Sequence, residues 1–143
     1  MSGKTAMWVG VLSTSTALAG GLGAVEGITR VDPQVGITKL APMTELAMPG
    51  QPPVQGGEHE FFRDSSAAVG VWEGGPGVAR IDSYPVDEFW WIVEGSIVFT
   101  DTTGKSYTFK AGDSFVLHKG FSGTTRMPGK LRKVYVSLGG GIR

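Results

Sequence analysis

The feature that most constrains this chain is a series of short strand-like runs, each closed by a turn, between residues 60 and 138. These runs are rich in Val, Ile, Thr and aromatic residues, and they end at turns such as Gly74-Gly75-Pro76-Gly77, Glu94-Gly95 and Pro128-Gly129. Short strands separated by turns favour a sandwich or barrel. No apolar pattern with a helical period is long enough for a long helix, which disfavours a parallel α/β sheet. The sequence therefore predicts an all-β domain.

We expect about nine strands, within the ranges 35–46, 67–73, 78–84, 88–93, 96–101, 105–110, 114–118, 121–127 and 131–138. Pro42 interrupts the first range, and the Pro- and Gly-rich stretch 49–57 is expected to be a loop. In the last range Val134 and Val136 alternate with Lys133 and Tyr135, which predicts a strand buried mainly on one face.

The composition limits the class of protein. A length of 143 residues supports one domain with a short extension. The formal net charge is zero, whereas a nucleic-acid-binding protein needs surplus Lys and Arg to displace counterions from phosphate. The chain has no cysteine, so no disulfide or thiolate metal site is expected. We expect neither a nucleic acid nor a membrane as partner.

Residues 1–30 differ in composition from the rest, which we expect to form a single barrel over residues 31–143. Residues 6–22 are mildly apolar but too polar to span a membrane. The step Ala17-Leu18-Ala19 could serve as a signal-peptidase site, although Ser and Thr at 13–16 weaken the apolar core. We favour an N-terminal arm on the barrel or on a neighbouring subunit and a cytoplasmic location; export is the alternative if residues 1–19 act as a signal.

Two stretches resemble the paired motifs of the cupin superfamily, whose fold is an RmlC-like jelly-roll barrel. Glu88 is followed after six residues by Gly95, and Gly112-Asp113 leads to His118 and Gly120. Together with Trp72-Glu73 and the run 132–136, these residues resemble the branch of (S)-ureidoglycine aminohydrolase and the ethanolamine-utilisation Q protein. The resemblance covers residues 67–138 and implies an all-β cupin barrel with an N-terminal arm.

The resemblance departs at the metal site. Metal-binding cupins carry a His-x-His pair before the motif glutamate and a third histidine in the second motif. Here the two places of the His-x-His pair fall on Asp82 and Tyr84, or on Ile81 and Ser83 in an alternative register. The place of the third histidine falls on Gly123. None of these residues has an imidazole. A transition metal needs three or four donors at about 2.0–2.2 Å. Because Glu88 alone remains, we expect no metal and no other cofactor.

Five further residues are candidates for ligand binding. Arg80 is expected to share a strand face with Asp82 and Tyr84, where it would pair with Glu88 or hold a substrate carboxylate; the alternative is a surface ion pair. Trp90 is expected on the face of Glu88, with Trp91 on the other. Trp90 and Trp72 can stack on a ligand, although filling the core or a subunit contact is the favoured interpretation.

Two histidines complete the candidates. His118 replaces a turn proline at a strand end near the barrel mouth, where it serves as a general base or is simply an exposed turn residue. His59 lies between Glu58 and Glu60, but adjacent strand residues point to opposite faces, which argues against a metal site there. Lys133 and Tyr135 fit the branch pattern and share one face.

We therefore expect a metal-free cupin barrel that binds a small polar or carboxylated metabolite. One alternative is a metal-independent enzyme, an isomerase, dehydratase or lyase, with Glu88 or His118 as acid or base. The other is a non-catalytic dimeric scaffold. The resemblance implies a homodimer, because cupins commonly associate through a sheet face and an exchanged N-terminal strand.

Overall fold

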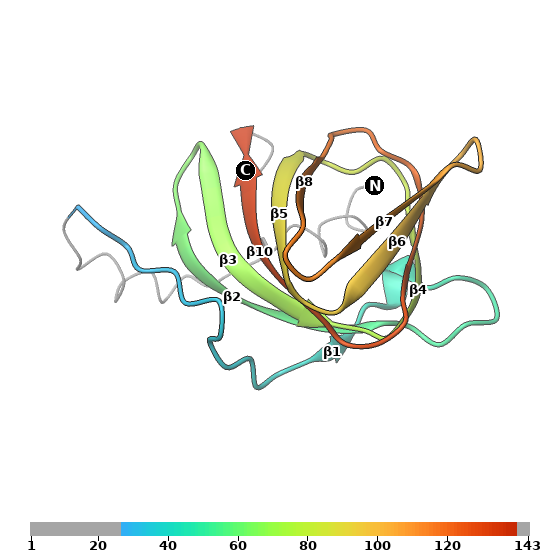
Figure 1. Ribbon diagram of the computed structural model, residues 1–143, viewed down its shortest axis with the longest axis horizontal. Helices are drawn as coiled ribbons and strands as arrows, with labels where there is room; N and C mark the ends of the chain where they lie inside the picture. The colour runs from blue at the N-terminus through green and yellow to red at the C-terminus, as the bar shows by residue number, and fades with distance from the viewer. Residues whose placement is uncertain (1–26, 140–143) are drawn as a thin grey trace.

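The protein consists of two antiparallel β-sheets that face each other (Figure 1) in a computed structural model that describes residues 27–139. The larger sheet has the strand order β1-β2-β3-β10-β5-β8 and the smaller has the order β4-β9-β6-β7. The strands of the larger sheet are β1 (Ala41–Pro42), β2 (Gln55–Arg63), β3 (Ala67–Gly74), β10 (Leu131–Leu138), β5 (Asp87–Glu94) and β8 (Ser114–Leu117). Those of the smaller are β4 (Gly77–Ile81), β9 (Gly123–Met127), β6 (Ser96–Asp101) and β7 (Ser106–Lys110).

The chain passes repeatedly from one sheet to the other through short turns. It crosses between β3 and β4, between β4 and β5, and between β5 and β6. After β7 it crosses again between β7 and β8, between β8 and β9, and between β9 and β10. The turn between β6 and β7 is held by Asp101, whose Oδ1 accepts hydrogen bonds from the backbone N–H groups of Thr103 and Lys105. Such an Asx arrangement fixes a tight turn. The described strands form two sheets rather than one closed barrel.

An apolar core lies between the sheets. It includes Trp72 and Trp90 from the larger sheet, with Ile97 and Phe99 from the smaller. A short 3-10 helix, η1 (Thr44–Leu46), adds Leu46 to this core. The core therefore lies between the inner faces of the sheets, as expected for a two-layer β-domain.

The all-β prediction is confirmed, and most of the expected ranges match a strand. The expected first strand pair in 35–46 is wrong except for Ala41–Pro42; this strand ends at Pro42, which has no backbone N–H to continue the ladder. The loop expected over 49–57 is also too long, since β2 begins at Gln55. Residues 1–26, which contain most of the expected arm and the possible signal, lie outside the described residues. Within residues 27–139, no helix is long and apolar enough to cross a membrane.

Candidate functional site

Glu88 is completely buried on the inner face of the larger sheet and is held by three hydrogen-bond donors. The Tyr84 hydroxyl donates to Oε1 at 2.6 Å, and the Trp90 indole N–H donates to the same oxygen at 2.7 Å. The Ser137 hydroxyl donates to Oε2 from β10, where Ser137 lies directly opposite Glu88. Both carboxylate oxygens therefore accept hydrogen bonds from within the protein.

Tyr84 reaches this position from the turn after β4. Its backbone N–H donates to the carbonyl of Phe121 at 2.8 Å, and its carbonyl accepts from Gly120 N–H at 2.7 Å. These bonds attach the turn to the segment between β8 and β9. The side chain is fully buried, and burial, followed by the charge of Glu88, raises the Tyr84 pKa well above its ordinary value. Tyr84 therefore remains a proton donor to the carboxylate.

Lys133 provides the positive charge of the interior. It lies on β10, is fully buried, and its Nζ is 3.6 Å from Glu88 Oε1. The same ammonium lies 3.1 Å from the centroid of the Trp90 ring and 5.5 Å from that of Trp72. Attraction of a cation to these ring faces compensates part of its lost hydration. Burial nevertheless lowers the Lys133 pKa to about 7. The negative charges of Glu88 and Glu58 act in the opposite direction and raise this pKa, but their effect is smaller than that of burial.

Glu58 is the second carboxylate near Lys133. It stands on β2 opposite Trp72, which in turn stands opposite Lys133 on β10. The Tyr135 hydroxyl donates to Glu58 Oε1 at 3.4 Å. Burial raises the Glu58 pKa to about 7, with further increases from the charges of Glu60 and Glu88; Lys133 and Tyr135 act in the opposite direction. At neutral pH, Glu58 is therefore distributed between its neutral and ionised forms.

The structure separates the residues predicted for this site into two groups. Glu88, Tyr84, Trp90 and Trp72 come together in the interior, and Trp91 faces outward as expected. Arg80 and Asp82 do not join them: their side chains are more than half exposed and pair with each other, with Arg80 Nε 3.5 Å from Asp82 Oδ1.

The shared face expected for Arg80, Asp82 and Tyr84 is therefore wrong. Strand β4 ends at Ile81, and the chain then turns through Ser83, whose φ is +60°. This turn breaks the two-residue alternation, so Tyr84 points inward although Arg80 and Asp82 point outward. The surface ion pair that was the alternative for Arg80 matches what is observed.

His118 also lies away from Glu88. Its side chain is 79% exposed, and its Nδ1 is 3.2 Å from Asp87 Oδ1. Asp87 Oδ1 also accepts the Lys119 backbone N–H at 3.0 Å, and this bond, followed by the one from His118, lowers the Asp87 pKa. The expected position at a strand end is correct, whereas its role as a base stays a prediction. His59 is exposed and contacts the Phe61 ring.

Three residues of the interior cluster were not assigned to a site from the sequence: Lys133, Glu58 and Ser137. The available signal was the alternation in β10, which places Lys133, Tyr135 and Ser137 on one face. Strand β10 is in fact buried on both faces, so the expectation of burial mainly on one face is wrong. The more polar set faces the interior because Ser137 lies opposite Glu88 and Tyr135 opposite Trp90.

The residues around Glu88 do not fit a divalent metal. Within residues 27–139, no group of three His, Cys, Asp or Glu side chains could hold one. At Gly123, where the third histidine was placed, a Cβ atom would lie 2.1 Å from the Thr100 carbonyl oxygen, so no larger residue fits. Glu88 alone, already bonded to three donors, lacks the additional protein ligands that a metal requires.

Comparison with known proteins agrees with this architecture. A family model described as the EutQ-like cupin domain matches residues 61–135, which is just over half of the chain. No curated protein matches the sequence. Among solved structures, the Clostridium difficile EutQ protein is 16% identical with a TM-score of 0.59, and the match covers 81% of this chain and 97% of that one.

Two further structures show the same fold. A protein of unknown function from Pseudomonas syringae pv. tomato is 22% identical with a TM-score of 0.64; the match covers 75% of this chain but only 46% of that one, so the present chain spans less than half of that protein. A putative ethanolamine utilization protein Q from Salmonella typhimurium is 23% identical with a TM-score of 0.51, covering 62% of this chain and 71% of that one. With the family model matching more than half of its length, the chain belongs to the EutQ-like cupin family.

Proposed function

We propose that this protein is a metal-free cupin whose interior binds a small polar metabolite, and that the Lys133 ammonium replaces a metal ion as the counter-charge of Glu88. The observation that carries the proposal is the fully buried pair, with Lys133 Nζ 3.6 Å from Glu88 Oε1. A buried carboxylate is costly unless a cation and hydrogen bonds stabilise it. Lys133 supplies the cation; Tyr84, Trp90 and Ser137 supply the hydrogen bonds.

A buried hydroxyl on the opposite sheet supports a polar ligand. Thr125 lies on β9 between Ala79 and Phe99, both core residues, so its side chain faces the interior. Its Oγ1 is buried and has no hydrogen-bond partner within residues 27–139. Leaving a buried hydroxyl without a partner costs about 1–3 kcal/mol, which a polar ligand atom or a water molecule would recover.

The charges of the interior favour a neutral polar ligand over a carboxylated one. Glu88 and Glu58 oppose the ammonium of Lys133, and at pH 7 both Glu58 and Lys133 are partly neutral because burial brings the pKa of each to about 7. A ligand carboxylate would add a further negative charge close to these groups and would favour protonation of Glu58. Binding of a carboxylated ligand is therefore expected to weaken as the pH rises through 7.

Binding should not depend on metal. Protein treated with a chelator, and screened by thermal shift against neutral polar and carboxylated metabolites, is expected to retain its binding. Thr125→Val should reduce the affinity about tenfold by removing one hydrogen bond, whereas Thr108→Val, on the exposed strand β7, is the matched control. Loss of binding on chelation that zinc, manganese, iron or nickel restores would overturn the proposal.

A metal-independent enzyme is the second candidate, because the interior contains two groups whose pKa is near 7, Glu58 and Lys133. Groups with such pKa values exchange protons readily at neutral pH. In this second candidate, Glu58 and Lys133 take the acid–base role that the sequence had suggested for Glu88 or His118. Turnover that Glu58→Gln abolishes without unfolding the protein would favour the enzyme; unchanged turnover in this variant would exclude Glu58. The homodimer and the non-catalytic scaffold stay predictions, tested by light scattering.

A further inference from the structure

Lys133 places a primary amine in the interior of the domain. Its side chain is completely buried, and its Nζ lies 3.6 Å from Glu88 Oε1 and 3.1 Å from the centroid of the Trp90 ring. Burial lowers its pKa to about 7, so about half of the side chain is a neutral amine at pH 7. A lysine in water, with an ordinary pKa of about 10.4, is neutral in roughly one molecule in 2,500 at that pH. A neutral, desolvated amine is the form of lysine that attacks a carbonyl carbon.

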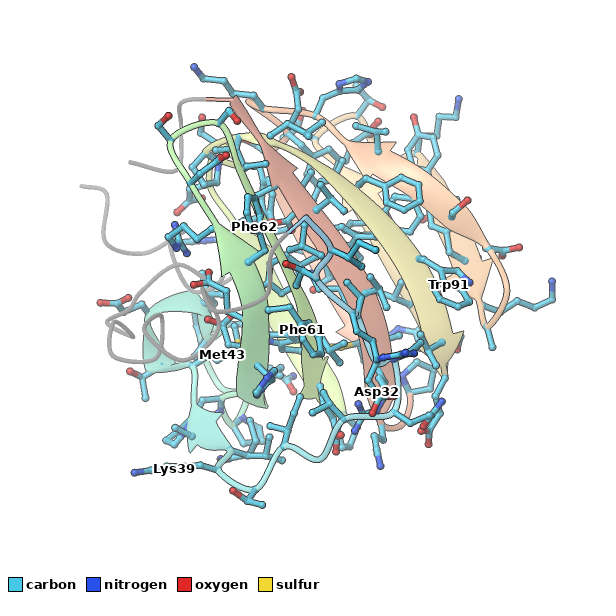
Figure 2. The ribbon with its side chains drawn as sticks, turned by 90° about the vertical axis from the view of Figure 1, so that its left-hand side faces the viewer. Asp32, Lys39, Met43, Phe61, Phe62 and Trp91 are labelled. Carbon is cyan, nitrogen blue, oxygen red and sulfur yellow. The ribbon has the colours of Figure 1, made fainter. Side chains whose placement is uncertain are left out.

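The neighbouring cation on the same strand points the other way. Arg132 lies on the outer face of the larger sheet, where its Nη1 donates to the carbonyls of Pro33 and Val35 at 3.1 and 2.8 Å. Figure 2 shows the segment 32–39, which Arg132 holds, crossing this outer face. Strand β10 is paired with β3 on one side and with β5 on the other, so a small molecule cannot pass through the sheet. It has to reach Lys133 from the space between the two sheets.

The charges around Lys133 select the kind of covalent bond that its amine can form. Glu88 has hydrogen-bond donors on both oxygens, but the cation beside it is Lys133. Acylation would convert the amine to a neutral amide, and carbon dioxide would convert it to a carbamate anion. Either product would leave Glu88 buried without a cation, which is strongly unfavourable. Condensation with an aldehyde gives a protonated imine instead, which keeps one positive charge beside Glu88 and against the Trp90 ring.

We propose that the Lys133 amine forms a reversible imine with a small neutral aldehyde in the interior, an assignment that rests on the proposed binding of a small polar metabolite there. The neutral amine attacks the carbonyl carbon, and a proton passes from nitrogen to oxygen to give a neutral carbinolamine. A second proton, for which the partly protonated Glu58 is the donor, lets the oxygen leave as water. The nitrogen then forms the C=N bond and takes the positive charge. Overall, one ammonium and one aldehyde give one protonated imine and one water molecule.

Reductive trapping in the full chain tests this assignment. Glycolaldehyde, a small neutral hydroxyaldehyde, is the probe, and cyanoborohydride at pH 7 reduces its imine to a stable secondary amine. Peptide mapping by mass spectrometry then measures the extent of modification at each lysine. The matched control within the chain is Lys105, whose Nζ also lies over an aromatic ring, 5.0 Å from the centroid of Tyr107, but whose side chain is exposed.

Lys133 should be modified at least about tenfold faster than Lys105. Its excess of neutral amine over a lysine in water is about a thousandfold, and the local opening that admits the aldehyde offsets part of this excess. The preference should disappear in urea that unfolds the protein, because the burial that favours the neutral amine is then lost. Modification of Lys133 that is no faster than that of Lys105, or a preference that persists in the unfolded chain, would overturn the imine.

The same experiment separates the imine from the non-covalent binding on which it rests. Thermal shifts with neutral polar metabolites that depend on Thr125, without a preferred adduct at Lys133, would overturn the imine and leave the proposed binding intact. Absence of both the thermal shifts and the adduct would overturn the two proposals together. The variant Lys133→Met/Glu88→Leu, which removes both charges, should retain the modification of Lys105 at the parent's rate; a slower rate would show that the two lysines do not react independently and would contradict the assignment.

Discussion

The two faces of the larger sheet depart from the usual distribution of polarity, because charged side chains stand within an otherwise apolar inner face and large apolar side chains are exposed on the outer one. Its inner face carries Glu88, Lys133 and Ser137, which are fully buried, whereas its outer face carries Trp91 and Val116 with large exposed fractions. An ordinary antiparallel sheet packs its apolar face on the core and turns its polar face to water. The difference teaches that alternation along a strand identifies two faces but does not decide which one is inside. Here the decision comes from cross-strand partners, because Ser137 and Tyr135 lie opposite Glu88 and Trp90.

The largest expected effect follows from removing the interior cation. Lys133→Met keeps the side-chain volume but leaves Glu88 buried without its counter-charge, which should destabilise the protein by about 3–5 kcal/mol. The double variant Lys133→Met/Glu88→Leu should recover most of this loss, because it removes both charges. Urea unfolding, followed by tryptophan fluorescence, measures the free energy of unfolding of the single and the double variant. A Lys133→Met variant as stable as the parent would show that the pair does not set the polarity of the inner face.

The next effect concerns the donors to Glu88. Tyr84→Phe removes the 2.6 Å hydrogen bond to Oε1 and should cost about 1.5–3 kcal/mol, the range for a bond to a charged group. Tyr107→Phe is the matched control, because its hydroxyl makes only a 3.4 Å contact with Asp101 at the surface. Equal losses in the two variants would argue against a special role for the buried carboxylate.

A smaller, pH-dependent effect is expected at Glu58, whose pKa burial raises from 4.5 to about 7. A raised carboxyl pKa contributes stability that is fully present below the unfolded value and is lost as the pH rises through the folded one. Glu58→Gln lacks this titration, so its stability relative to the parent should rise by about 1–2 kcal/mol between pH 4.5 and 7.5. This change is smaller than the free energy that corresponds to the whole pKa shift, because Glu58 is partly exposed and water screens its charge.

Denaturant unfolding at several pH values in this window measures the Glu58 effect. Lys133, whose pKa is lowered from 10.5 to about 7, changes the stability in the opposite direction from about pH 6 upward, so the Glu58 effect is measured most directly between about pH 4.5 and 6. Glu45→Gln, at an exposed position of η1, is the control and should leave the pH profile parallel to that of the parent. Parallel profiles for Glu58→Gln and the parent would contradict the burial of Glu58 beside the cluster.

The sequence predicted the fold better than the site, and the reason is geometric. The turns and the motif spacings around Glu88 and Gly95 depend on local rules, so most strands beyond residue 66 and the family were correctly predicted. The interior cluster instead depends on pairing between distant strands: Glu58 approaches Lys133 through Trp72 across three strands. Arg80 shows the converse error, since its assignment assumed that β4 continued beyond Ile81, and the turn at Ser83 was not predictable from alternation alone.

The smallest expected effect contrasts the interior ion pair with the one on the surface. Arg80 and Asp82 are separated by 3.5 Å, a distance similar to that of Lys133 and Glu88, but their side chains are 54% and 53% exposed. Water screens such a pair, and ordering two mobile side chains offsets most of the attraction, so Arg80→Ala should change the stability by less than about 0.5 kcal/mol. Added salt should weaken the surface pair and leave the buried one almost unchanged. Urea unfolding of Arg80→Ala and Lys133→Met at low and high salt measures this contrast. A loss for Arg80→Ala approaching that of Lys133→Met would mean that distance, and not burial, governs both pairs.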